Sequence, residues 1–243
     1  MNAFKHLPHL RDRIIPADKS RMRATPAMLA LWDKMASDAG RPANWRWSDE
    51  QLEASRRATL GELGPDSDLW ILAYGSLMWD PGCHFAEVRR AVVEGYSRRF
   101  SYGDTAGRGT PENPALMLAL EPDSGCCEGL VFRIASNLVS QESSVVWCRE
   151  MLFGGYNPKM LPVSTPQGEL RALAFVANSN HMDYVGELDI EACASMIAKA
   201  TGAMGTNRQY LDQLVNQLEK LGIHDTYVQM LDLEVKRAVL ALG

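Results

Sequence analysis

One residue of this sequence combines a titratable side chain with surroundings that favour proton transfer. Glu150 stands near the end of a helical pattern that also holds Trp147 and Met151, and Gly154 and Gly155 follow it. Partial removal from water raises the pKa of a carboxyl group toward the range that is useful for proton transfer. Glu150 is therefore our candidate base. The alternative is a solvated glutamate on a helix surface, the usual fate of this residue type.

A loop suited to holding an anion follows the first apolar strand pattern. It consists of Tyr74, Gly75, Ser76 and Leu77. A glycine directly after a buried strand lets consecutive backbone N–H groups turn toward a carboxylate or an oxyanion. The alternative is an ordinary turn that binds nothing.

Two further glycine-rich segments contain a candidate binding residue. Arg108 lies in residues 105–111, whose spacing matches neither GxGxxG nor a P-loop. It is placed either to pair with a substrate carboxylate or to remain a solvated loop arginine. Tyr210 follows the second segment, in which Thr206 or Asn207 is a good helix N-cap. That structural role accounts for the cap residues, and Tyr210 is a candidate to face a site.

The cysteines and histidines give no sign of a metal, a disulfide framework or a thiol nucleophile. The five cysteines are odd in number, and their only close pair is Cys126 with Cys127. The five histidines form no HExxH or HxH unit. Cys148 lies beside Glu150, but no local signature joins it to a histidine, and a buried structural thiol is the simpler reading. We expect no metal, no cofactor and a reducing cytoplasm.

Composition limits the class of protein. The 243 residues are 46% hydrophobic and 23% charged, which is typical of a globular chain with one sizeable domain and an appendage. The formal net charge of −5 provides no excess of cations for a nucleic-acid backbone. No apolar segment follows the basic residues at the start, and no run of about 18 apolar residues occurs. We therefore expect a soluble protein that is neither secreted nor membrane-spanning and that binds no nucleic acid.

The pattern of elements predicts an α+β fold with an N-terminal helical extension, residues 1–67, and a catalytic domain, residues 68–243. Short apolar runs separated by Gly, Pro, Asn and Asp indicate the strands of a small sheet or barrel. Apolar residues at helical spacing indicate the helices. The predicted strands are residues 69–74, 88–93, 99–102, 116–120, 129–134 and 170–176, and the predicted helices are residues 27–39, 51–63, 138–152, 189–200, 207–221 and 225–242.

Residues 68–235 carry, in order, the motifs YGSLMW, GYSRRF, AGRGT, GLVFRI, WCREM with YNP, and GTNRQYL. Together these motifs resemble those of the ChaC-type γ-glutamylcyclotransferases. The resemblance implies a small mixed β-barrel flanked by helices, and a cofactor-free enzyme that converts glutathione to 5-oxoproline and cysteinylglycine. It assigns the acid–base role to Glu150 and glutamyl binding to the loop of Tyr74 to Leu77. Arg108, Tyr156 and Tyr210, which stand in or beside the matching motifs, are our further candidate substrate contacts.

The resemblance leaves alternatives open. The same cyclisation on other γ-glutamyl peptides or amines is one, because the loop would hold the glutamyl half of the substrate. Many relatives carry Pro-Gly-Arg after the RGT motif, where this chain has Asn113, Pro114 and Ala115, so substrate preference is the property most open to change. A regulatory protein that keeps the fold without turnover is the other alternative, and the intact Glu150 and YGSL motif argue against it.

Overall fold

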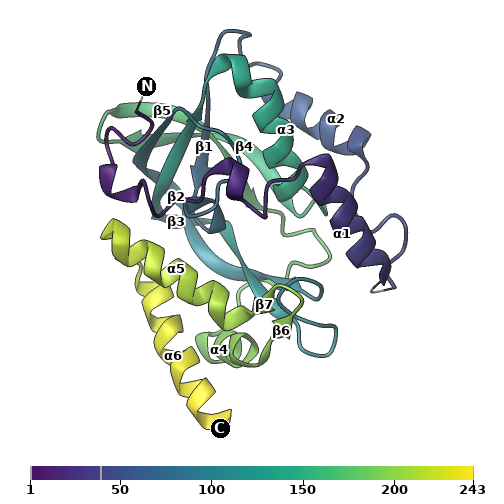
Figure 1. Ribbon diagram of the computed structural model, residues 1–243. Coiled ribbons are helices and arrows are strands. Elements are labelled where there is room, and N and C mark those ends of the chain that lie inside the picture. The colour runs from purple at the N-terminus through teal and green to yellow at the C-terminus, as the bar shows by residue number, and fades with distance from the viewer. Residues whose placement is uncertain (1, 39, 243) are drawn as a thin grey trace. The chain divides into compact units, whose positions relative to one another are not determined.

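The computed structural model describes residues 2–38 and 40–242 (Figure 1). Contacts between residues divide the chain into two compact units, which are described one at a time. The first unit comprises Met1–Tyr96 and Asp123–Ala177, and the second comprises Ser97–Pro122 and Asn178–Gly243. Residues 1–67 thus belong to the same unit as the first strand, and the domain boundary at residue 67 stays a prediction.

Five strands form a closed barrel in the order β1-β3-β2-β4-β5. Strand β1 runs antiparallel to β3 and parallel to β5, so the barrel is mixed. Its strands are buried on both faces where β1 pairs with β3: Leu130 and Phe132 lie on one face and Leu72 on the other, and each is at most 1% exposed. The predicted α+β fold with a small mixed barrel is confirmed. The strands are β1 (Leu69–Ala73), β2 (Glu87–Asp104), β3 (Ala115–Ile134), β4 (Tyr156–Thr165) and β5 (Gly168–Ala177).

Two strands, β2 and β3, are longer than the sequence predicted, because each joins two predicted strands. A further strand, β4, was not predicted. Residues 88–93 and 99–102 are parts of one strand, β2, which continues through Gly95 at a φ of 80°. In the same way β3 continues through a polar stretch that reads as a turn. Strand β4 was not predicted because Pro158 and Pro162 lie within it, and proline usually argues against a strand. It nevertheless pairs with β5 along its whole length.

The helices of the first unit are α1 (Pro26–Asp38), α2 (Asp49–Leu60) and α3 (Val139–Glu150). Helix α2 begins with a capping box, in which the side chain of Ser48 accepts from the backbone of Gln51 and the side chain of Gln51 accepts from the backbone of Ser48. The predictions of these three helices are confirmed, apart from Ala39, which lies outside the described residues.

The second unit contains three helices, α4 (Ile190–Lys199), α5 (Asn207–Leu221) and α6 (Thr226–Leu242). A short ribbon of β6 (Thr201–Gly202) and β7 (Gly205–Thr206) precedes α5. These three helices were predicted, since each buries an apolar stripe. Val239, the last predicted stripe residue of α6, is 43% exposed, whereas the other stripe residues of α5 and α6 are buried, among them Leu211, Leu214, Leu218, Val228, Leu231 and Val235.

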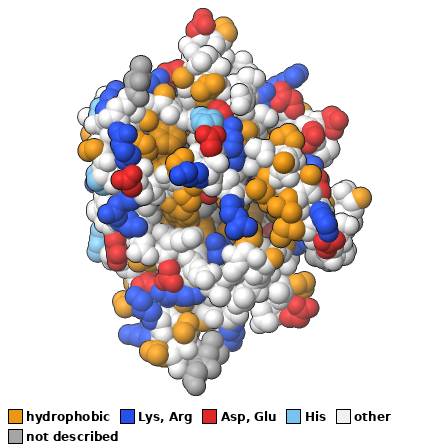
Figure 2. Space-filling view, viewed as in Figure 1, with side chains coloured by type: hydrophobic (Ala, Val, Ile, Leu, Met, Phe, Trp, Pro, Cys, Tyr) orange, Lys and Arg blue, Asp and Glu red, His pale blue; other side chains and the backbone are white. Residues whose placement is uncertain are grey.

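Acidic and basic side chains are interspersed over the face of the protein that Figure 2 shows. This mixture agrees with the small net charge of −5. Of the helices in the described ranges, none has both the length and the apolar character needed to cross a membrane.

Candidate active site

Glu150 is the last residue of α3, and its carboxyl group is largely withdrawn from water. Its side chain is 14% exposed, and its Oε1 lies 2.9 Å from Nε of Arg149. Burial raises the pKa of Glu150 above its ordinary value, and the charge of Arg149 opposes part of that rise. The site therefore holds a carboxyl group with a raised pKa next to a fixed cation, which suits a group that must both take and return a proton.

Aromatic packing fixes the end of α3. Trp147, one turn before Glu150, is 1% exposed, and its ring centroid lies 5.4 Å from that of Phe175 on β5 in an edge-to-face arrangement. Its indole N–H donates to Ser55 of α2 over 3.3 Å. These contacts hold the helix against the barrel on one side and against α2 on the other.

The chain turns sharply directly after Glu150. Gly154 has a φ of 68°, and a Cβ added there would lie 2.2 Å from the ring of Trp47. Glycine is therefore required both by the backbone conformation and by the close approach of the indole. The glycines that follow Glu150 in the sequence thus serve this turn, and Trp47 of the N-terminal region covers it.

The loop of Tyr74 to Leu77 links β1 to a short 3-10 helix, Ser76–Met78. Tyr74 is buried, and its hydroxyl donates to the backbone carbonyl of Phe175 over 2.7 Å. Leu77 is buried as well. Within the described ranges, the backbone N–H groups of Gly75, Ser76 and Leu77 donate to no other group of the chain. The buried side chains of Tyr74 and Leu77 therefore anchor the loop, and its role in substrate binding stays a prediction.

Arg149 joins this loop to the candidate base, a role that sequence reasoning missed. Its Nη2 donates to Oγ of Ser76 over 3.0 Å, and its Nη1 donates to the backbone carbonyl of Asp80 over 2.5 Å. Its Nε faces Glu150. One guanidinium thus contacts both predicted parts of the site. The only sequence signal was a cation directly before a glutamate in the WCREM motif.

Asp80 is the second acidic group at this guanidinium. It is 6% exposed, and its Oδ1 lies 4.0 Å from Nη1 of Arg149. Among the described residues, this oxygen has no hydrogen-bond partner. The charge of Arg149 is therefore shared between two carboxylates, of which Glu150 is the nearer.

Tyr156, the first residue of β4, lies in the same region of the first unit. Its ring centroid is 6.5 Å from that of Phe175, the residue that also contacts Trp147 and accepts from Tyr74. Phe175 and Arg149 are therefore the two residues around which the predicted site residues of the first unit gather.

Arg108 and Tyr210 belong to the second unit, where they contact each other. The guanidinium carbon of Arg108 lies 5.4 Å from the ring centroid of Tyr210, and its Nη1 donates to the carbonyl of Thr206 over 2.9 Å. Burial lowers the pKa of Arg108 from its ordinary value. Tyr210 is 4% exposed and packs against Phe100. The assignment of both residues as substrate contacts stays a prediction.

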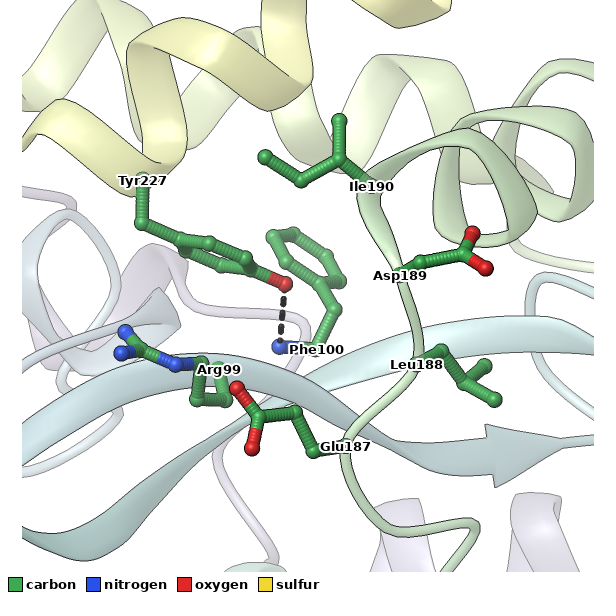
Figure 3. A pocket seen from close by; sticks show the side chains of 7 residues that line it. All are labelled: Arg99, Phe100, Glu187, Leu188, Asp189, Ile190 and Tyr227. Atoms are coloured by element: carbon green, nitrogen blue, oxygen red, sulfur yellow. Dashed lines mark hydrogen bonds between the residues drawn. The ribbon is translucent and has the colours of Figure 1, made fainter.

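A cavity of about 210 Å³ occurs within the second unit (Figure 3). The hydroxyl of Tyr227 accepts from the backbone N–H of Phe100 over 3.1 Å, and the guanidinium of Arg99 lies over the Tyr227 ring. None of the predicted site residues lines this cavity, whose lining is Arg99, Phe100, Glu187, Leu188, Asp189, Ile190 and Tyr227.

The burial of Cys148 argues against a role as a nucleophile. Burial raises the pKa of its thiol, which disfavours the reactive thiolate. All of the cysteines are free thiols, and each lies within the described ranges.

A closed mixed barrel with a largely buried glutamate at the end of a packed helix places this protein among the γ-glutamylcyclotransferase folds. A crystal structure of a γ-glutamylcyclotransferase specific to glutathione from yeast aligns with a TM-score of 0.65 and 23% identity, over 71% of this chain and 97% of the other. The family model described as ChaC-like protein matches residues 69–238, and the chain belongs to this family.

Curated relatives agree with this assignment. A protein of Escherichia coli (strain K12) named glutathione-specific gamma-glutamylcyclotransferase is 37% identical over 192 residues, which cover 79% of this chain and 83% of that protein. Glutathione-specific gamma-glutamylcyclotransferase 1 of Homo sapiens is 36% identical over 163 residues, covering 65% of this chain and 73% of the relative. The family resemblance predicted from the motifs is confirmed.

Proposed function

We propose that this protein is a glutathione-specific γ-glutamylcyclotransferase that converts glutathione to 5-oxoproline and cysteinylglycine. The observation that carries the proposal is the position of Glu150 beside Arg149, with Ser76 of the YGSL loop on the same guanidinium. The curated relatives named above bear this activity in their names.

The reaction needs positioning and proton transfer. The α-amine of the glutamyl group attacks its own γ-carbonyl carbon, a C–N bond forms that closes a five-membered ring, and the amide bond to the cysteine nitrogen breaks. The amine enters as an ammonium and loses two protons, one to water before the attack and one as the new C–N bond forms, while the departing nitrogen gains one. Glu150 takes the second of these protons from the attacking nitrogen and gives it to the departing nitrogen. Holding the glutamyl chain in a folded conformation supplies several kcal/mol of the acceleration.

The loop binds the charged parts of the glutamyl group. Backbone N–H groups of Gly75, Ser76 and Leu77 are suited to the α-carboxylate or to the oxyanion that develops on the γ-carbonyl. Arg149 counteracts part of the effect of burial on the pKa of Glu150 and so favours its carboxylate form. Tyr156 is proposed as a further contact on the glutamyl side.

An assay of three substrates tests the proposal. Purified protein is incubated with glutathione, oxidised glutathione and γ-glutamyl-alanine, and 5-oxoproline and the released amine are quantified. We expect 5-oxoproline from glutathione, with cysteinylglycine in equal amount. If γ-glutamyl-alanine gave product with the same efficiency, the protein would be a cyclotransferase for γ-glutamyl compounds in general and not one specific to glutathione. If no substrate gave product, the alternative of a regulatory protein without turnover would remain.

The place of action follows from the same chemistry. Glutathione is most abundant as the thiol in a reducing compartment, and the sequence has no paired cysteine framework. We propose the cytoplasm as the site of action.

A further inference from the structure

The segment of residues 3–23 precedes the part of the chain that the family model matches, yet it packs along residues 79–88. The backbone N–H of Ile15 donates to the carbonyl of Trp79 over 2.8 Å. The rings of Phe4 and Phe85 lie 5.6 Å apart, edge to face. Residues 79–88 follow directly on the YGSL loop and the 3-10 helix, so the N-terminal segment supports the chain that leaves the candidate site.

Arg23 makes the most buried ion pair of this segment among the described residues. Its Nη1 and Nη2 lie 2.6 and 2.9 Å from the two carboxylate oxygens of Glu142 on α3, which makes this a bidentate ion pair. Its Nη1 also donates to the carbonyl of Gly82 over 2.9 Å. Glu142 is 0% exposed and also accepts from the backbone N–H of His84 over 2.9 Å. Arg23 therefore joins helix α3 to the turn of residues 82–84.

The same turn touches Arg149. Gly82 has a φ of 64°, and a Cβ added there would lie 3.2 Å from Nη1 of Arg149 and 3.4 Å from the carbonyl oxygen of Met22. Arg149 also donates to the carbonyl of Asp80, two residues before Gly82. The turn is thus held between the N-terminal segment on one side and the guanidinium that contacts Glu150 on the other.

We propose that Arg23 is a positioning residue for the reaction, acting through Glu142 and Gly82 on the relative placement of Glu150, Arg149 and Ser76. Glu142 precedes Glu150 on α3 by eight residues, about 12 Å along the helix axis. Arg23 therefore fixes both the helix that ends in the base and the turn that limits where Arg149 lies. This role rests on the proposed function, and it assigns a task to a region outside the matched family domain.

The variants are chosen so that a loss of folding does not hide the answer. Removal of Arg23 alone leaves a buried, unpaired carboxylate on Glu142, which is strongly destabilising. The double variant Arg23→Met with Glu142→Gln removes both charges and keeps an acceptor for His84. Arg23→Lys keeps the positive charge. Its single ammonium group cannot make the bidentate contact with Glu142 and the hydrogen bond to Gly82 at the same time. Arg21→Met, an exposed arginine of the same segment, is the matched control.

The measurement is kcat and KM with glutathione at 25 °C, with the folded fraction taken from circular dichroism and from the thermal unfolding midpoint. We expect the folded double variant to lose roughly 10- to 100-fold in kcat, the loss typical of a slightly misplaced catalytic group, with KM changed less than about twofold. Arg23→Lys should recover part of this loss, and Arg21→Met should match the unchanged protein.

The outcomes separate the two proposals. An unchanged protein that does not turn over glutathione would overturn the proposed function. A wild-type kcat in the folded double variant, with only the unfolding midpoint lowered, would show that Arg23 merely stabilises the fold. Should the double variant not fold, a wild-type kcat in Arg23→Lys would overturn the positioning role just as well.

Discussion

Nε of Arg149 lies 2.9 Å from Oε1 of Glu150, its neighbour in the chain. Burial and the charge of Arg149 change the pKa of Glu150 in opposite directions. Burial favours the neutral acid, and the adjacent guanidinium favours the carboxylate. A group that must first take a proton and then give it back works best when its pKa lies near the working pH. Burial and Arg149 together set the pKa of Glu150, so the proposed mechanism depends on both residues.

Replacement of Glu150 by glutamine should abolish turnover and preserve the fold. The carboxamide has the size of the carboxyl group but cannot carry the proton between the two nitrogens. We expect kcat to fall by roughly 10²-fold or more, the range seen for a lost acid–base group. Initial rates of 5-oxoproline formation measure the loss, and circular dichroism checks the fold. Substantial residual activity in a folded variant would remove Glu150 from the mechanism.

Replacement of Arg149 by methionine should shift the pH dependence of kcat/KM. Without the guanidinium, only burial acts on Glu150, so its raised pKa rises further. The base is then protonated at a higher pH, and the acid limb of the profile moves upward. Arg149→Lys keeps a positive charge and should show a smaller shift. An acid limb at the same pH in Arg149→Met and in the unchanged protein would contradict this coupling.

Within the YGSL loop, the backbone should matter more than the hydroxyl of Ser76. Ser76→Ala removes one hydrogen bond from Arg149 and should lower kcat/KM by about 10-fold, the value of one charge-assisted bond. Gly75→Ala places a methyl group among the N–H donors that the substrate must approach, so its loss should be larger and should appear in KM as well. Ser76→Thr, which keeps the hydroxyl, is the control. A larger loss in Ser76→Ala than in Gly75→Ala would make the side chain the main binding group.

The residues of the site differ in how well they can be predicted from the sequence. Glu150 was predicted because its motif and its place at a helix end are local features. The contacts of Arg149 depend on where the loop after β1 lies, which no local pattern specifies. Arg23 and Glu142 are 119 residues apart in the chain, and neither stands in a motif. Long-range pairing of this kind becomes visible only in the fold.

The strands show a similar limit. Glycine and proline in β2, β3 and β4 read locally as turns, because these residues are usually excluded from strands. Ladder pairing within the closed barrel overrides that preference, as the uninterrupted pairing of β4 with β5 shows. The helices were predicted more closely, since their apolar stripes recur over several turns and depend less on partners far along the chain.

Glu87, at the start of β2, is the buried centre of a cluster of basic side chains. Its side chain is 5% exposed, and its carboxylate lies 2.6 Å from Arg89, 3.1 Å from His6, 3.2 Å from Arg133 and 3.4 Å from Lys5. Burial raises the pKa of Glu87, but the contacts with Arg89 and Lys5 outweigh it and lower the pKa from 4.5 to about 2. The cluster ties the N-terminal segment to the barrel.

The stability of the first unit should therefore decline in acid, and Glu87→Gln should remove part of this dependence. A carboxyl group whose pKa is lower in the folded state stabilises the fold above its unfolded pKa, and this contribution is lost as pH falls from about 4.5 to 2. Its size is on the order of 3 kcal/mol at neutral pH. Urea unfolding between pH 2.5 and 7, at roughly half-unit steps, measures the free energy of unfolding.

Glu87→Gln should have a lower free energy of unfolding at pH 7, and this free energy should vary less with pH. Glu94 is an exposed residue on the same strand, and the control Glu94→Gln should follow the unchanged protein. An equal pH dependence in Glu87→Gln and in the unchanged protein would place the acid sensitivity elsewhere.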